Sequence, residues 1–140
     1  MFKNILSVIL GLAASSFIIF ASEVIGHIIY PPPAGLDIND MDAVKAFSAS
    51  APLIVFILVI VAYAIGSFVG GLIAASIASQ NKMTKSITVG GILMGLGAYN
   101  LLMIPHPIWT IVISIFLFIP CSYVGGILGI KISSKKNPNS

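Results

Sequence analysis

Long apolar stretches and short polar connections alternate along the chain and divide it into four segments. The apolar stretches cover about residues 5–30, 52–79, 86–104 and 107–130. An α-helix rises about 1.5 Å per residue, so about 20 apolar residues are enough to cross the hydrocarbon core of a membrane. The pattern therefore predicts four transmembrane helices, and it gives no reason to divide residues 1–140 into more than one domain.

The apolar stretches are continuous and rich in glycine and alanine, whereas the strands of a membrane β-barrel alternate apolar and polar residues. The expected fold class is therefore an all-α membrane protein. The connections QNKMTK and PHP are short, so the four helices should pack as two antiparallel hairpins in a small four-helix bundle. Lys3 gives the chain a basic start, but the first apolar stretch continues to Tyr30 and is longer than the hydrophobic region of a usual signal peptide, so we do not expect cleavage.

The first connection is long and polar, and its sequence YPPPAGLDINDMD contains both extended and helix-starting residues. The three prolines favour an extended chain directly after the first span. Asn39 or Asp40 can cap a short helix through MDAVKAF, in which Met41, Val44 and Phe47 recur at three-residue spacing. We expect this short helix to lie on the outer surface of the membrane.

Composition supports the membrane assignment, because 58% of the residues are hydrophobic and 8% are charged, against roughly 25% charged in soluble domains. Six of the seven basic residues fall at the chain ends or in QNKMTK, and only Lys45 falls in the first connection. By the positive-inside rule, both termini should be cytoplasmic, and the first connection and PHP should face outward. The net charge of +3 arises from this asymmetry and does not predict nucleic-acid binding.

The acidic residues and both histidines gather toward the expected outer side. Glu23 and His27 lie one helical turn apart on one face of the first span, and Asn100 lies at a comparable depth in the third. An ionisable residue below the membrane interface is costly and therefore suggests a functional site. Together with His106 of the PHP turn, these residues form a candidate polar recess.

Each of these residues also has a simpler interpretation. Glu23 could be hydrated through the loop and paired with His27 or with a neighbouring backbone group. Asn100 could hold two helices together, and His106 could bond the backbone of the turn. The alternatives stay open at this point.

The recess residues do not match a known metal or catalytic motif. Two histidines and a carboxylate can bind zinc, but the paired HExxH and CxxC spacings are absent from the chain. The segment DINDMD lacks the glycine that a calcium loop needs at its sixth position. We therefore predict no metal, no cofactor and no catalytic residue.

Glycines recur at the spacing that lets membrane helices approach closely. The segments SFVGGLIAASIAS and SYVGGILGIKISS, in the second and fourth spans, align without a gap, which suggests a duplicated hairpin. The residues expected to mediate helix packing are Gly66, Gly70, Gly71, Gly91, Gly95, Gly125, Gly126 and Gly129.

Three segments together resemble a pattern of small four-span bacterial membrane proteins that carry no assigned activity. They are the loop YPPPAGLDINDMD, the glycine-rich second span and the segment NLLMIPHPIW. In that family a PPP-G-D-DM loop follows the first helix, and N-x-x-x-x-P-x-P-x-W joins the last two. The resemblance covers most of the chain and implies a bacterial inner-membrane protein of this architecture, with no catalytic residues.

Three functions are compatible with the sequence. The first is a non-enzymatic membrane component that lies in the lipid bilayer and associates with itself or with another membrane protein through its glycine faces. The second is a proton- or cation-coupled transporter that uses Glu23 and His27. The third is a metal-dependent membrane enzyme that uses both histidines and Glu23. We favour them in that order.

Overall fold

The computed structural model describes residues 1–104 and 106–138, and this part of the chain is helical without strands. Its elements are α1 (Phe2–Ile29), α2 (Met41–Ala49), α3 (Leu53–Ile77), α4 (Lys82–Met103) and α5 (Ile108–Lys136). All of these except α2 are long and apolar enough to cross a membrane. The predicted all-α class and the four candidate spans are confirmed.

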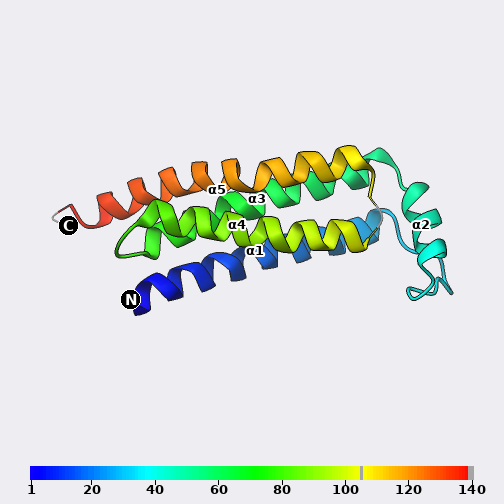
Figure 1. Cartoon of the computed structure of the whole chain (residues 1–140), viewed down its shortest axis with the longest axis horizontal. Helices are drawn as coiled ribbons and strands as arrows, with labels where there is room; N and C mark the ends of the chain where they lie inside the picture. The colour runs from blue at the N-terminus through cyan, green and yellow to red at the C-terminus, as the bar shows by residue number, and fades with distance from the viewer. Residues whose placement is uncertain (105, 139–140) are drawn as a thin grey trace.

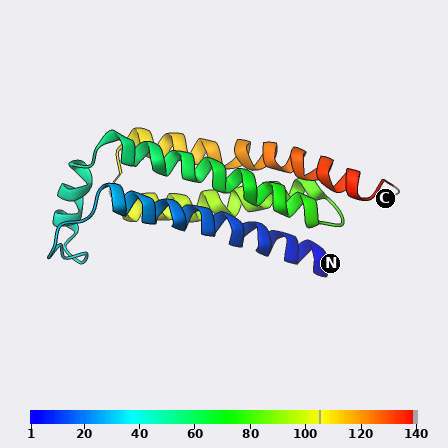
Figure 2. The ribbon, with the colours of Figure 1, turned by 180° about the vertical axis from the view of Figure 1, so that it is seen from behind.

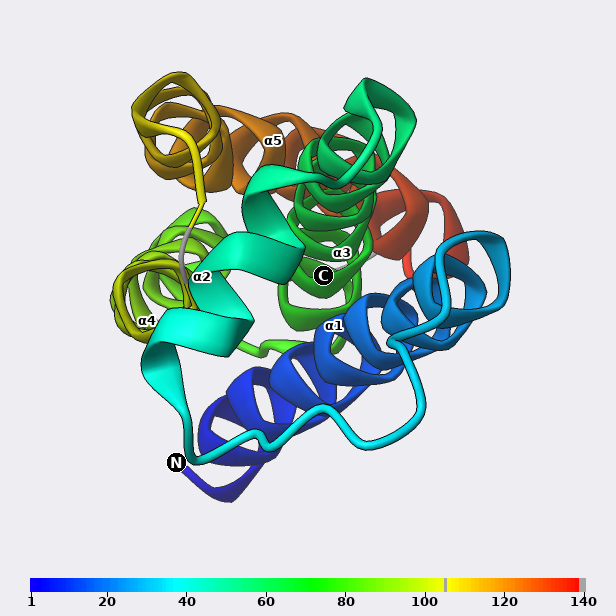
Figure 3. The ribbon, with the colours of Figure 1, turned by 90° about the vertical axis from the view of Figure 1, so that its right-hand side faces the viewer.

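The four long helices lie along one another, and α2 lies across one end of the bundle (Figure 1). The start of α1, the end of α5 and the connection between α3 and α4 lie at the opposite end, as the view from behind also shows (Figure 2). Seen from the α2 end, the short helix crosses in front of the ends of the long ones (Figure 3). Helix α3 contacts α1, α4 and α5, and its interface with α5 is the most extensive.

Two helix boundaries differ from the hydropathy pattern. Helix α4 begins at Lys82 rather than at residue 86, and α5 continues to Lys136 rather than to residue 130. Hydropathy marks where the chain is apolar, but lysine is a good helix former and continues a helix into water. The backbone itself is interrupted at Asn81, whose φ of 49° is left-handed, and α5 ends at Lys136, with Asn137 as its C-cap just before Pro138.

The short helix α2 is capped at its start as the sequence predicts. The Asp40 carboxylate accepts hydrogen bonds from the backbone amides of Asp42 and Ala43, at 3.1 and 3.3 Å. This satisfies donors that the first turn of a helix leaves unpaired.

Glycines allow α3 and α5 to approach backbone to backbone. A Cβ atom added at Gly125 would collide with the Phe68 carbonyl group, and one added at Gly129 would collide with the Leu72 carbonyl oxygen. On the other helix, a Cβ at Gly71 would collide with the Ser122 carbonyl oxygen. One glycine of each repeated Gly-Gly pair, Gly71 on α3 and Gly125 on α5, therefore lies in this interface, where close approach leaves no room for a side chain.

The remaining glycines of the two helices contact the flanking helices. Gly66 and Gly70 face Ser15 of α1, and Gly126 faces Ser86 of α4. The Ser15 hydroxyl donates to the Gly66 carbonyl oxygen at 2.8 Å, which adds a hydrogen bond between α1 and α3. Small residues thus bring the helices together, and hydroxyl groups link their backbones.

Gly91 and Gly95 have no neighbour of an added Cβ in the part of the chain that the structure describes, so their role in packing stays a prediction. A Cβ atom at either position would meet nothing within 4 Å, whereas Gly90 and Gly97 face Ser122 and Phe118 of α5. Successive helical residues are rotated by about 100° around the axis, so Gly91 cannot share the face of Gly90. Glycine spacing alone does not show which of two adjacent glycines faces a neighbour.

Candidate functional site

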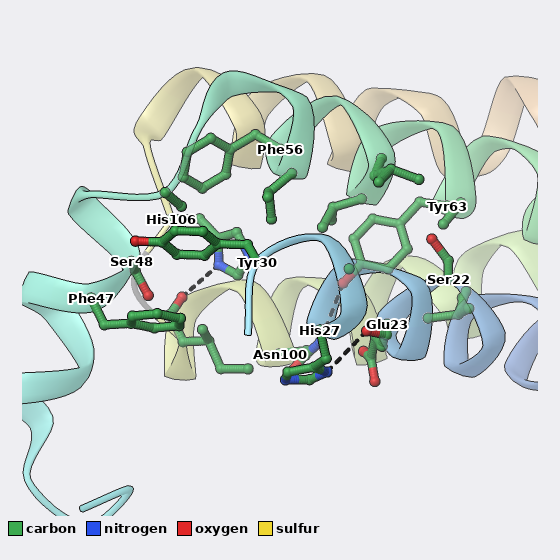
Figure 4. A pocket seen from close by; sticks show the side chains of 18 residues that line it. Ser22, Glu23, His27, Tyr30, Phe47, Ser48, Phe56, Tyr63, Asn100 and His106 are labelled. Carbon is green, nitrogen blue, oxygen red and sulfur yellow. Dashed lines mark hydrogen bonds between the residues drawn. The ribbon is translucent and has the colours of Figure 1, made fainter. Parts of the chain in front are cut away.

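A pocket of about 280 Å³ lies at the α2 end of the bundle. Its walls come from α1, α3 and α4, and α2 and the connection between α4 and α5 also contribute to it (Figure 4). Most of the lining is apolar. The structure brings all four residues of the candidate recess to this pocket, namely Glu23, His27, Asn100 and His106.

Glu23 and His27 come from the last turns of α1, and both side chains are exposed. The Nδ1 atom of His27 lies 2.9 Å from the backbone carbonyl oxygen of Glu23. A carbonyl oxygen can only accept, so Nδ1 donates this hydrogen bond. The contact therefore uses the backbone of Glu23, and within the described residues the Glu23 carboxylate makes no hydrogen bond.

Asn100 links α4 to α3 at the pocket. Its Nδ2 atom donates to the Tyr63 hydroxyl group at 3.2 Å. Tyr63 is buried, and its ring packs against Phe118 of α5 with the ring centroids 5.1 Å apart. Asn100 therefore forms a contact between two helices, and the same side chain also lines the pocket.

His106 lies in the connection between α4 and α5, next to Pro105, which is outside the described residues. Its Nδ1 atom lies 2.7 Å from the Ile104 carbonyl oxygen and, by the same reasoning, donates to it. The ring meets Phe56 edge to face at 6.2 Å between centroids. The backbone bond agrees with the simpler interpretation of His106 as a turn residue, although the ring also lines the pocket.

Aromatic side chains join α2 to the rest of the pocket. Tyr30, at the end of α1, stacks on Phe47 of α2 with the ring centroids 4.8 Å apart. The Tyr30 and Ser50 hydroxyl groups are hydrogen-bonded at 2.8 Å. These two contacts hold α2 against the end of α1.

Several pocket residues were not identified from the sequence. Tyr63, Tyr30 and Phe47 each line the pocket, but in an apolar stretch an aromatic residue looks like ordinary core or interface. One feature of the sequence could have indicated the role of Tyr63. A tyrosine deep within a span needs a hydrogen-bond partner for its hydroxyl group. Asn100 is such a partner at a matching depth.

The arrangement brings carboxylate, imidazole, amide and hydroxyl groups to one pocket. Within residues 1–104 and 106–138, no group of three or more His, Cys, Asp and Glu side chains lies close enough together to hold a metal ion. The hypothesis of a metal-dependent enzyme therefore has no ligand set in the described part of the chain.

Comparisons with protein-family models, with curated proteins and with solved structures give no match for this chain. The functional argument therefore depends on the pocket itself.

Proposed function

We propose that the protein is a bacterial inner-membrane protein of two antiparallel helical hairpins, with both termini in the cytoplasm and α2 on the outer surface. The placement of the lysines supports this orientation. Six of the seven lie in the N-terminal segment, the α3–α4 connection with the start of α4, or the last part of α5. These segments share the end of the bundle that is opposite α2 (Figure 1).

The protein acts as a non-enzymatic membrane component that binds a small amphiphilic molecule in the outer pocket. The observation that carries this proposal is the convergence of Glu23, His27, Asn100 and His106 on one pocket with mostly apolar walls. Small-molecule sites combine apolar walls with a few polar groups that orient the ligand. A carboxylate kept within a membrane span is costly, so it is more readily explained by a ligand than by stability.

A pair of glycine variants tests ligand binding. Gly26 lines the pocket, and neither Gly26 nor Gly91 has an atom within 4 Å of an added Cβ, so both sites accept a larger residue. Gly26→Leu should fill the pocket and remove binding of small amphiphiles, measured by calorimetry on protein in lipid nanodiscs. Gly91→Leu, away from the pocket, is the matched control and should bind normally. If both variants bind the amphiphile equally, this pocket is not the binding site.

Proton- or cation-coupled transport is an extension of the same proposal, because it would use the same pocket. Uptake of a ligand into proteoliposomes that Glu23→Gln abolishes would favour a carrier over a static component.

Association with a second copy or with another membrane protein is a second candidate function. It is supported by Gly91 and Gly95, a small-xxx-small pair on α4 at which an added Cβ meets no described residue within 4 Å. Gly95→Leu should lower the fraction of cross-linked oligomer in membranes, and Gly26→Leu should leave it unchanged. If Gly95→Leu leaves the fraction of cross-linked oligomer unchanged, this face of α4 is not the oligomer interface.

A further inference from the structure

The charge of the outer pocket restricts the molecules that fit it. Among the residues that line it, Glu23 is the one acidic side chain, and no lysine is present. Lys45 belongs to α2, but it is not part of the lining. With neutral histidines the pocket therefore carries a single negative charge, which no basic side chain of the lining balances.

Both histidines line the pocket, and each keeps one ring nitrogen that no described residue uses. Each Nδ1 atom donates to a backbone carbonyl oxygen, His27 to Glu23 and His106 to Ile104. In a neutral imidazole ring the nitrogen that carries no hydrogen is an acceptor, so Nε2 of each ring can accept a hydrogen bond. The Glu23 carboxylate adds further acceptor oxygens that no described residue uses.

Aromatic rings line the same pocket as these acceptors. They belong to Tyr30, Phe47, Phe56 and Tyr63, and Figure 4 shows Tyr30 and Phe56 beside His106, with His27 and Glu23 at the edge of the group. Aromatic faces attract cations through the ring quadrupole, and the rings also provide apolar surface for a hydrocarbon chain. A carboxylate and acceptor nitrogens favour a ligand that carries both a positive charge and N–H donors.

We propose that the pocket binds a protonated primary amine with an apolar tail, and that Glu23 is its counter-ion. This inference rests on the proposed function of ligand binding and specifies the class of ligand. The ammonium group donates to the Glu23 carboxylate and to the histidine Nε2 atoms, and the tail contacts the aromatic walls. A volume of about 280 Å³ is near the lower limit of about 300 Å³ for small-molecule pockets, so the ligand is small.

Four probes with the same six-carbon tail test the proposal. They are hexylammonium, hexyltrimethylammonium, 1-hexanol and hexanoate, added to the full chain in nanodiscs of zwitterionic lipid. Trp109 is the single tryptophan and lies 6.1 Å from Phe56 between ring centroids, so its fluorescence reports on the pocket, with calorimetry as a second readout. Hexylammonium should bind at least about tenfold more tightly than 1-hexanol, the size expected for a charge-assisted hydrogen bond.

Variants assign this preference to Glu23. Glu23→Gln keeps the shape of the side chain and should abolish the preference for hexylammonium while leaving 1-hexanol binding unchanged. Glu23→Asp keeps the charge and should restore part of the preference. Asp42→Asn removes a charge from α2 outside the pocket lining and should have no effect.

The possible failures are distinguishable. Hexanol, hexanoate or hexyltrimethylammonium binding as tightly as hexylammonium overturns the inference, as does an unchanged preference in Glu23→Gln. Binding itself, sensitive to Gly26→Leu, would then still support the proposed function. If no probe binds the unmodified chain, the proposed function fails together with the inference.

Discussion

At the scale of single residues, the structure separates glycines that are required from glycines that are free to vary. Gly125 lies against the backbone of α3, whereas Gly91, in the same expected set, meets no other helix. In the sequence, both glycines belong to a small-xxx-small pair. The difference arises from the rotation of each helix around its axis, which packing determines and residue spacing alone does not.

Gly125→Ala should therefore destabilise the protein. The added methyl group collides with the Phe68 carbonyl group, a backbone atom that cannot turn aside, so α3 and α5 must separate. Overpacking of this kind costs about 1–3 kcal/mol of unfolding free energy. Thermal unfolding in detergent should show a lower midpoint for Gly125→Ala and an unchanged one for Gly91→Ala. Equal midpoints would show that the interface is looser than the structure describes.

The hydrogen bond between Asn100 and Tyr63 gives a second residue-scale prediction. Tyr63→Phe keeps the ring against Phe118 but removes the hydroxyl group that accepts from Asn100. Hydrogen bonds between membrane helices contribute about 0.6 kcal/mol on average and up to about 1.7 kcal/mol. Denaturant unfolding should show a loss in this range. Tyr99→Phe, on an exposed face of α4, is the control, and an equal loss there would remove the assignment to this bond.

At the scale of elements, α2 depends on its cap and on the contacts of Tyr30. The Asp40 carboxylate accepts from two backbone amides of the first turn, and no residue of α2 is fully buried. A short helix with so little buried surface has a small free energy of local opening. Loss of the cap should therefore affect α2 before it affects the bundle.

Asp40→Ala should increase the hydrogen exchange of the α2 backbone amides by about fivefold, which corresponds to a cap of about 1 kcal/mol. The amides of α3 should exchange as before, because the Asp40 carboxylate accepts from amides in the first turn of α2. The control is Asp42→Ala, which keeps both acceptor bonds because Asp42 donates through its backbone. Faster exchange throughout the chain would mean that α2 and the bundle open together.

The elements could be predicted from the sequence more fully than the pocket. Continuous apolar runs identify four long helices, and an aspartate before MDAVKAF identifies the cap of α2, since both signals are local. Glu23 and His27 could be paired because they lie one turn apart on one helix. The roles of Tyr63, Tyr30 and Phe47 depend on which helices are neighbours and at what depth, and hydropathy does not contain that information.

At the scale of the whole molecule, the bundle has two chemically different ends. The end with both termini carries six of the seven lysines, and the α2 end carries the pocket and all four acidic residues. Large apolar side chains such as Phe17, Phe20 and Phe116 are exposed on the long helices between these ends. Such a surface is compatible with a lipid environment, and the charge asymmetry supports the orientation that we propose for the bundle.

This orientation leads to a labelling prediction for the whole chain. In a background in which Cys121 is replaced by alanine, a membrane-impermeant maleimide should modify Ala34→Cys in intact cells, because residue 34 is exposed in the connection at the α2 end. Pro138→Cys should be modified only after the membrane is permeabilised, because the proposed orientation puts the adjacent lysines of α5 on the cytoplasmic side. Both variants should react in permeabilised cells, which controls for accessibility. Modification of Pro138→Cys in intact cells would reverse the orientation and place the pocket of Glu23 on the cytoplasmic side.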